Sequence, residues 1–141
     1  MKKNQLFYLI TFLFISILFS CDKSESEGSD DLYQSWVVMD FLSVESNDYP
    51  KDKNFSPVIE FRKDGNYSLK LDVNSCSGSF TLMGESSINI STAGCTKICC
   101  DSKFSQKFLA MIPQLTSYSI EGKEMKLIIP GWGWIELKAV K

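Results

Sequence analysis

A strict alternation of apolar and polar residues behind a tight-turn sequence is the strongest constraint on how this chain folds. Over residues 67–73 every second side chain is apolar, namely Tyr67, Leu69, Leu71 and Val73. This period of two predicts a strand with one face in the core and the other toward solvent. The preceding Asp64-Gly65 pair tolerates the positive φ of a tight hairpin turn, and P-V-I-E-F-R stands before it. Residues 57–73 are therefore predicted to form a β-hairpin.

The same two-residue period recurs along most of the chain. Further strands are predicted at residues 36–44, 79–83, 87–91, 116–121, 125–129 and 132–140. Short turns at Gly84, at Gly122 and at Pro130-Gly131 make neighbouring strands antiparallel. The predicted fold class is mainly β (α+β), with about eight short antiparallel strands in a curved sheet or open barrel.

One segment has the period of a helix instead. Between residues 101 and 112 the large apolar side chains recur three and four positions apart, at Phe104, Phe108, Met111 and Ile112. This spacing predicts one amphipathic helix, with Asp101 or Ser102 as its N-cap. Pro113 should end or kink it, because proline removes a backbone donor and clashes with the preceding turn. We expect the helix to cover one end of the barrel.

The N-terminus has the features of an exported lipoprotein. Two lysines precede an apolar run from Leu6 to Phe19, which is short for a membrane span but typical of a signal peptide. The following L-F-S-C resembles the lipobox of bacterial lipoproteins, in which the cysteine is lipidated and becomes the mature N-terminus. We predict a signal peptide over residues 1–20 and lipid attachment (palmitate and related acyl chains) at Cys21. An ordinary signal peptide or an uncleaved anchor is the alternative.

The segment after Cys21 is acidic and lacks apolar side chains until Leu32, so a flexible tether is predicted over residues 21–33 and one β-rich domain over 34–141. Removal of residues 1–20 leaves thirteen basic and seventeen acidic residues, a net charge of −4 without a basic stripe. Nucleic acid is therefore not an expected partner, and the membrane is reached through the lipid. We expect a cell-envelope protein, lipid-anchored at the outer membrane. The acids of the tether resemble sorting signals that direct some lipoproteins to the cell surface.

Catalytic chemistry has little support in the sequence. The chain contains no histidine, which removes the usual general base and every Ser-His or Cys-His pair. The folded part has no S-x-x-K motif and no glycine-rich phosphate loop. We therefore predict a protein that is not an enzyme, with no catalytic residues, no metal and no cofactor.

Four cysteines remain once Cys21 is lipidated, namely Cys76, Cys95, Cys99 and Cys100. An even number in an exported domain predicts two disulfides, and each long-range bridge stabilises the fold by about 3 kcal/mol. A bond between neighbours Cys99 and Cys100 requires a strained ring and is disfavoured, which leaves two connectivities. C-x-x-x-C-C lacks the paired C-x-x-C of zinc sites, so thiol-based binding of copper or zinc is the lesser alternative.

A family resemblance rests on several short segments in a fixed order. These are F-R-K-D-G-N-Y, N-S-C-S-G-S-F, a T-x-x-x-C loop, a helix with F-x-x-x-F-L, and Y-S-I-E-G-K-E-M-K-L-I. This order is similar to the META/HslJ-type domain, a small β-rich domain of bacterial envelope lipoproteins, and implies an envelope protein linked to stress tolerance. Cys95 and Cys99 look additional to the family pattern, so the resemblance favours a Cys76–Cys100 bridge with Cys95–Cys99 as the second. A lipocalin-like lipoprotein domain is the rival assignment.

The stretch P-G-W-G-W-I holds Trp132 and Trp134 on one side of a predicted strand. One interpretation is a stacking platform for a sugar or another planar ligand. The favoured alternative is that one tryptophan caps the barrel and the other lies on the helix, because aromatic side chains mainly supply buried area.

These observations together predict a non-catalytic envelope lipoprotein that acts by binding or structural support, with an unidentified protein or small-ligand partner. A lipocalin-like binder of a small apolar or sugar ligand is the alternative. An open cavity lined by Tyr67, Leu69, Trp132 or Trp134 would distinguish it.

Overall fold

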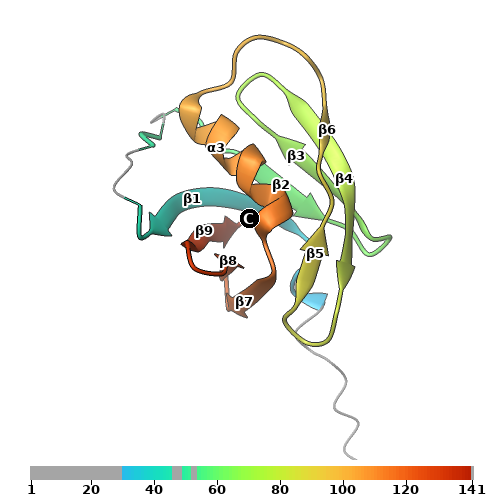
Figure 1. Cartoon of the computed structure of the whole chain (residues 1–141). Coiled ribbons are helices and arrows are strands. Elements are labelled where there is room, and N and C mark those ends of the chain that lie inside the picture. The colour runs from blue at the N-terminus through green and yellow to red at the C-terminus, as the bar shows by residue number, and fades with distance from the viewer. Residues whose placement is uncertain (1–29, 46–48, 52–53, 141) are drawn as a thin grey trace, which may run out of the picture.

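The computed structural model describes residues 30–45, 49–51 and 54–140. The predicted signal peptide, Cys21 and most of the predicted tether lie outside these ranges. Figure 1 shows the described strands and the helix. The strands are β1 (Ser35–Ser43), β2 (Val58–Phe61), β3 (Asn66–Lys70), β4 (Ser75–Leu82), β5 (Ile88–Ile90), β6 (Gly94–Cys95), β7 (Ser117–Glu121), β8 (Glu124–Ile129) and β9 (Gly133–Ala139). Helix α3 (Lys103–Met111) continues into a short 3-10 turn, η1 (Ile112–Gln114).

All strands belong to one antiparallel sheet that nearly closes on itself. Its order is β5-β4-β3-β2-β1-β9-β8-β7, and β6 pairs with β4 beyond the end of β5. The two outer strands meet, because Ile88 N donates to Thr116 O at 3.0 Å and Tyr118 N donates to Ser86 O at 2.9 Å. The structure thus confirms the predicted mainly β fold class, a strongly curved sheet or open barrel with one helix.

The hairpin predicted from the alternation forms as β2 and β3. Phe61 lies opposite Tyr67, and Gly65 adopts a φ of 78° in the turn. The Asp64 carboxylate accepts a hydrogen bond from Asn66 N at 2.9 Å, which fixes the turn. The prediction was wrong for Val73, which is exposed, because β3 ends at Lys70 and the chain turns before β4 begins.

The interior of the barrel is filled by large side chains. Those with less than 2 % of their surface exposed include Trp36, Tyr67, Phe61, Phe104 and Phe108. Leu32 is also fully buried, and its carbonyl accepts a hydrogen bond from Trp36 Nε1 at 3.0 Å. The packed fold therefore includes Leu32, which lies before the predicted boundary at residue 34.

Helix α3 lies across the barrel, as Figure 1 shows, and matches the sequence prediction closely. Ser102 is the N-cap, and its hydroxyl accepts a hydrogen bond from Ser105 N at 3.2 Å. Phe104 stacks on Phe41 of β1 with ring centroids 4.3 Å apart, which joins the helix to the sheet. Pro113 follows the helix inside η1, at the place where the sequence predicts its end. No helix in the described ranges is both long enough and apolar enough to cross a membrane.

The cysteine pairing preferred from the resemblance was wrong. Cys76 is bonded to Cys95, and Cys99 is bonded to its neighbour Cys100. The reason for the first bond is the register of β4 and β6, which places Cys76 directly opposite Cys95 with Cα atoms 4.0 Å apart. Cys95 is thus a partner of the motif cysteine, and the Cys76–Cys100 and Cys95–Cys99 bridges do not form.

Candidate functional site

A hollow of about 430 Å³ lies where the end of β1 meets the start of β9. It is lined by Phe41, Leu42, Ser43, Val44, Trp132, Gly133 and Trp134. We call it the tryptophan groove. The turn before β9 brings Trp132 back against β1, since Val44 N donates to Trp132 O at 3.0 Å and extends the β1–β9 ladder. Both tryptophans singled out in the sequence therefore line the same hollow.

Gly133 makes the close approach of the two strands possible. Its φ is 144°, a backbone conformation that residues with a side chain rarely adopt. A Cβ atom at this position would collide with the backbone carbonyl oxygen of Leu42. The glycine between the tryptophans is thus required by the contact between β9 and β1, as well as leaving the groove open.

Trp132 packs toward the helix side of the groove. Its ring meets Phe41 edge-on at a centroid distance of 6.5 Å. The Lys107 ammonium of α3 lies 5.2 Å from the Trp132 ring centroid and 4.8 Å from that of Tyr49. The indole N–H of Trp132 is buried and has no hydrogen-bond partner in the part of the chain that the structure describes. Trp132 therefore offers an unused donor beside a cation held between two rings.

Lys107 is fixed by more than the aromatic rings. Its ammonium forms an ion pair with Glu45 at 3.2 Å. Burial alone would lower the pKa of Lys107, but its interactions with Tyr49 and Glu45 outweigh burial and raise the pKa above its ordinary value. Lys107 is thus a fixed positive charge at neutral pH beside the groove.

Trp134 faces outward on the other side of the groove. It is 37 % exposed and lies directly opposite Leu42 on β1, which is exposed to the same extent. Its indole N–H donates to the Glu136 carboxylate at 3.2 Å, and the Lys126 ammonium lies 5.5 Å from its ring centroid. The two tryptophans thus turn in different directions, one against the helix and one toward solvent.

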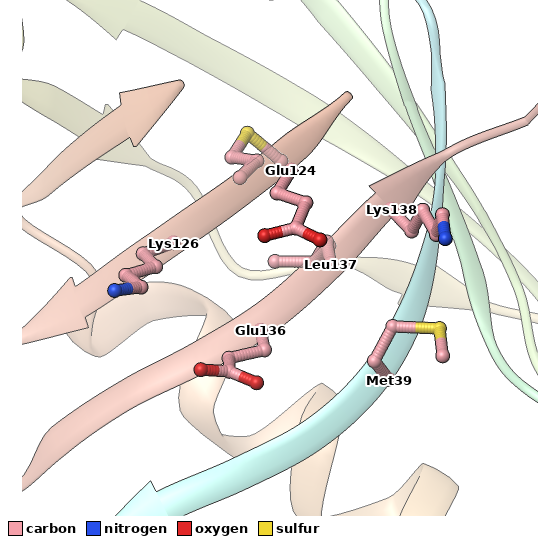
Figure 2. Close-up of a pocket in the computed structure, with 7 residues that line it drawn as sticks. Met39, Glu124, Lys126, Glu136, Leu137 and Lys138 are labelled. Atoms are coloured by element: carbon pink, nitrogen blue, oxygen red, sulfur yellow. The ribbon is translucent and has the colours of Figure 1, made fainter. Parts of the chain in front are cut away.

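A second hollow, of about 190 Å³, lies on the outer face of β1, β9 and β8. Figure 2 shows its charged side chains, Glu124 and Lys126 from β8 and Glu136 and Lys138 from β9. Met39 projects from β1 beside them. Each acid lies directly opposite a lysine, because the register pairs Glu124 with Lys138 and Lys126 with Glu136.

Met39 reaches this face through a β-bulge. The β1–β9 register shifts between Val38 and Asp40, so Met39 is an extra residue without a partner on β9. Val38 and Phe41 therefore both point inward, while Met39 and Leu42 are exposed. Neither this bulge nor the charged hollow was predicted from the sequence. The only signal is the broken alternation in V-V-M-D-F.

The interior is not arranged as a cavity around the residues named for a lipocalin-like binder. Tyr67 is fully buried, and its hydroxyl donates to Ser91 O at 2.8 Å. Burial raises the pKa of Tyr67 above its ordinary value. Leu69 is also buried within the core cluster. Of the four residues named, Trp132 and Trp134 line a hollow together, and it opens at the rim of the sheet.

The loop that carries the cysteines is held by the buried Asn74 and the half-buried Asp101. The side-chain amide of Asn74, just before β4, forms four hydrogen bonds with this loop, and one of them is to the Asp101 carboxylate. In the described ranges, no three acidic, cysteine or histidine side chains gather as the ligands of a metal ion.

The fold and the groove define a small antiparallel β domain with one covering helix and an open surface lined by tryptophan. The chain belongs to the META domain family, whose model matches residues 30–131. The family predicted from the sequence is thereby confirmed. No curated protein matches the chain.

Two solved structures have the same fold. An NMR structure of a protein from Burkholderia xenovorans is 16% identical, covers 82% of this chain and 88% of its own, and has a TM-score of 0.64. A crystal structure of a DUF4847 family protein from Bacteroides vulgatus is 18% identical, covers 81% of this chain and 99% of its own, and has a TM-score of 0.61. At these identities the likeness concerns the fold alone.

Proposed function

We propose that this protein is a lipid-anchored envelope protein whose META domain acts by binding, without catalysis, at the tryptophan groove. The anchor is the acylated Cys21 left after removal of residues 1–20. The proposal of an envelope location is supported by the basic start, the apolar run and the lipobox-like L-F-S-C. The family is one of small β-rich domains in envelope lipoproteins, which agrees with this location.

The observation that carries a binding role is the exposure of large apolar side chains around the groove. Leu42 and Trp134 are each 37 % exposed, and Val44 is 85 % exposed. A contiguous apolar surface of this kind is typical of interaction sites, because its exposure to water is otherwise unfavourable. Trp134 also carries a polar partner on its ring nitrogen, so its apolar face is oriented rather than free to rotate.

A small sugar is the second candidate ligand for the same groove. The ring of Trp134 supports stacking, while Glu136 and Ser43 lie nearby as acceptors for hydroxyl groups. This candidate agrees with the interpretation of the two tryptophans as a stacking platform for a sugar. In this case the ligand would lie at the rim of the sheet. A lipocalin-like binder would instead hold it inside the barrel.

The anchor is tested by expression of the full-length chain in a bacterium that processes lipoproteins. The wild type should incorporate an alkyne-labelled palmitate, fractionate with membranes and lose residues 1–20 by mass. Cys21→Ser should lose the label and the cleavage, whereas Cys95→Ser, which leaves the lipobox intact, should keep both. Palmitate incorporation in Cys21→Ser, or none in the wild type, would contradict the proposal.

The groove is tested separately on purified protein. Tryptophan fluorescence and chemical shifts would be followed during titration with mono- and disaccharides, in the wild type and in Trp134→Phe. Saturable changes that Trp134→Phe abolishes would support the sugar candidate. Saturable changes that persist in that variant would remove the groove as the sugar site.

A further inference from the structure

The outer face of β1 and β9 concentrates exposed apolar side chains. Met39 is 42 % exposed, and Leu42, Val44 and Trp134 continue the same surface toward the groove. The bulge at Met39 adds one apolar side chain to this face without disturbing the inward positions around it. We call these four residues the apolar ridge.

Beside the apolar ridge lies a surface of balanced charge. Glu124 and Lys138 form one cross-strand pair and Lys126 and Glu136 the next, so positive and negative groups alternate in both directions. Figure 2 shows these four side chains projecting from neighbouring strands, with Met39 at their border. These four side chains together carry no net charge and border a hollow of about 190 Å³, while the exposed Asp40 of β1, opposite Glu136, adds one negative charge at the edge of the face. Such a pattern is complementary to a zwitterionic group, which carries one charge of each sign.

The proposed anchor can bring this face to a bilayer. From Cys21 to Asp30 the chain has nine peptide links, which span at most about 30 Å. Strand β1, which begins five residues after Asp30, runs about 27 Å from Ser35 to Ser43. Met39, the nearest residue of the ridge, lies at the middle of β1, so the reach of the chain exceeds the distance along the strand from Ser35 to Met39. The acyl chains can therefore insert in a membrane against which the ridge lies.

We propose that the outer face of β1, β9 and β8 docks on a zwitterionic phospholipid surface, with the apolar ridge inserted among the lipids. The docking rests on the proposed anchor, and it makes a phospholipid surface the binding partner of the tryptophan groove. Lysines of the charged surface contact lipid phosphates, and its glutamates contact the headgroup ammonium. Tryptophan beside lysine is the composition found where proteins meet the membrane–water boundary.

A second copy of the chain is the competing occupant, and the observations favour the lipid. Four ridge side chains are few for a stable dimer, whose interfaces bury about 800 Å² on each partner. The anchor also holds the ridge next to lipid at a high effective concentration, which makes weak insertion sufficient.

The experiment uses the full lipidated protein reconstituted in vesicles of phosphatidylcholine and phosphatidylethanolamine, with and without brominated acyl chains. Subtracting the emission of Trp134→Phe from that of the wild type isolates the signal of Trp134. Docking predicts that brominated lipid removes most of this signal, and that acrylamide in the water quenches it weakly. Leu42→Ser with Val44→Ser should restore much of the signal while vesicle flotation stays unchanged. Met83→Ser, an exposed apolar residue on another turn, should leave the quenching as in the wild type.

Three results would overturn the inference, and they are distinguishable. Flotation with Trp134 quenched by acrylamide and not by brominated lipid means that the anchor holds and the face does not dock. Flotation with Trp134 shielded from both quenchers, together with cross-linked dimers, means that a second copy covers the ridge. Failure to float, with no acyl mass at Cys21, refutes the proposed anchor itself and the docking with it.

Discussion

Replacement of Asn74 by alanine should destabilise the domain more than any surface substitution. Asn74 is 8 % exposed and uses its whole amide group. Its Nδ2 donates to Ile98 O and to the Asp101 carboxylate, both at 2.6 Å. Its Oδ1 accepts from Thr96 Oγ1 and from Ile98 N, both at 2.8 Å. One side chain thus holds the cysteine loop against the start of β4.

The magnitude follows from these four bonds. Each intramolecular hydrogen bond contributes a net of about 0.5–1.5 kcal/mol, so four give a range of about 2–6 kcal/mol. Thr96 and Ile98 are exposed and regain bonds to water once the amide is gone, which favours the lower half of the range. We therefore expect Asn74→Ala to reduce the free energy of unfolding by about 2–4 kcal/mol.

The assay is equilibrium unfolding in urea of the oxidised protein, with both disulfides confirmed by mass. Asn74→Asp keeps the shape but places a second carboxylate against Asp101, so its loss should match or exceed that of Asn74→Ala at neutral pH and shrink in acid. Asn89→Ala, on the exposed side of β5, is the control and should stay within about 0.5 kcal/mol of the wild type. A loss below about 1 kcal/mol in Asn74→Ala would refute the idea that this amide holds the loop.

Three further predictions use the same unfolding assay. Cys76→Ser combined with Cys95→Ser opens a bridge between residues 19 apart and should cost about 3 kcal/mol; unchanged stability would contradict a staple. Gly133→Ala should cost about 3 kcal/mol or more, because of its positive φ and the collision with backbone, whereas Gly84→Ala, with positive φ but open space, should cost about 1 kcal/mol. Burial alone would raise the pKa of Asp72, but hydrogen bonds to its carboxylate, among them those from the N–H and the hydroxyl of Ser102, outweigh burial and lower the pKa below the ordinary 3.8. The stabilisation from Asp72 is therefore complete above that value and is lost as the pH falls toward the lowered pKa, and Asp72→Asn should flatten this acid loss. An equally steep acid loss in Asp72→Asn would count against this role.

The sequence predicted those parts of the fold that depend on local periodicity. The alternation at Tyr67 and Leu69 and the three- and four-residue spacing at Phe104 and Phe108 each place side chains on one face of an element, and tertiary packing preserved those faces. Strand β6 was missed because two residues cannot express a period. The cysteine pairing was wrong for the same reason, since the bond from Cys76 follows from the register of that short strand.

The candidate site, too, was only partly predictable from the sequence. Trp132 and Trp134 were conspicuous in the sequence because two large aromatic residues flank a glycine. The charged surface beside them was not predictable, because each lysine and glutamate of β8 and β9 reads by itself as an ordinary solvent-facing residue. Only the register between the two strands sets Lys126 opposite Glu136 and so creates an alternating pattern.

Two irregularities, one on each strand, explain why the outer face of β1 and β9 differs from the rest of the barrel. In a regular β1 with Val38 inward, Met39 would face outward, Asp40 inward and Phe41 outward. The bulge instead inserts Met39 while Val38 and Phe41 keep their inward positions opposite Leu137 and Ile135. On β9, Gly133 lets the backbone press against β1, and the turn just before it sets Trp132 beside the helix. Both features weaken a regular ladder, and both add exposed or half-exposed apolar surface at one place, which is what the proposed binding role requires.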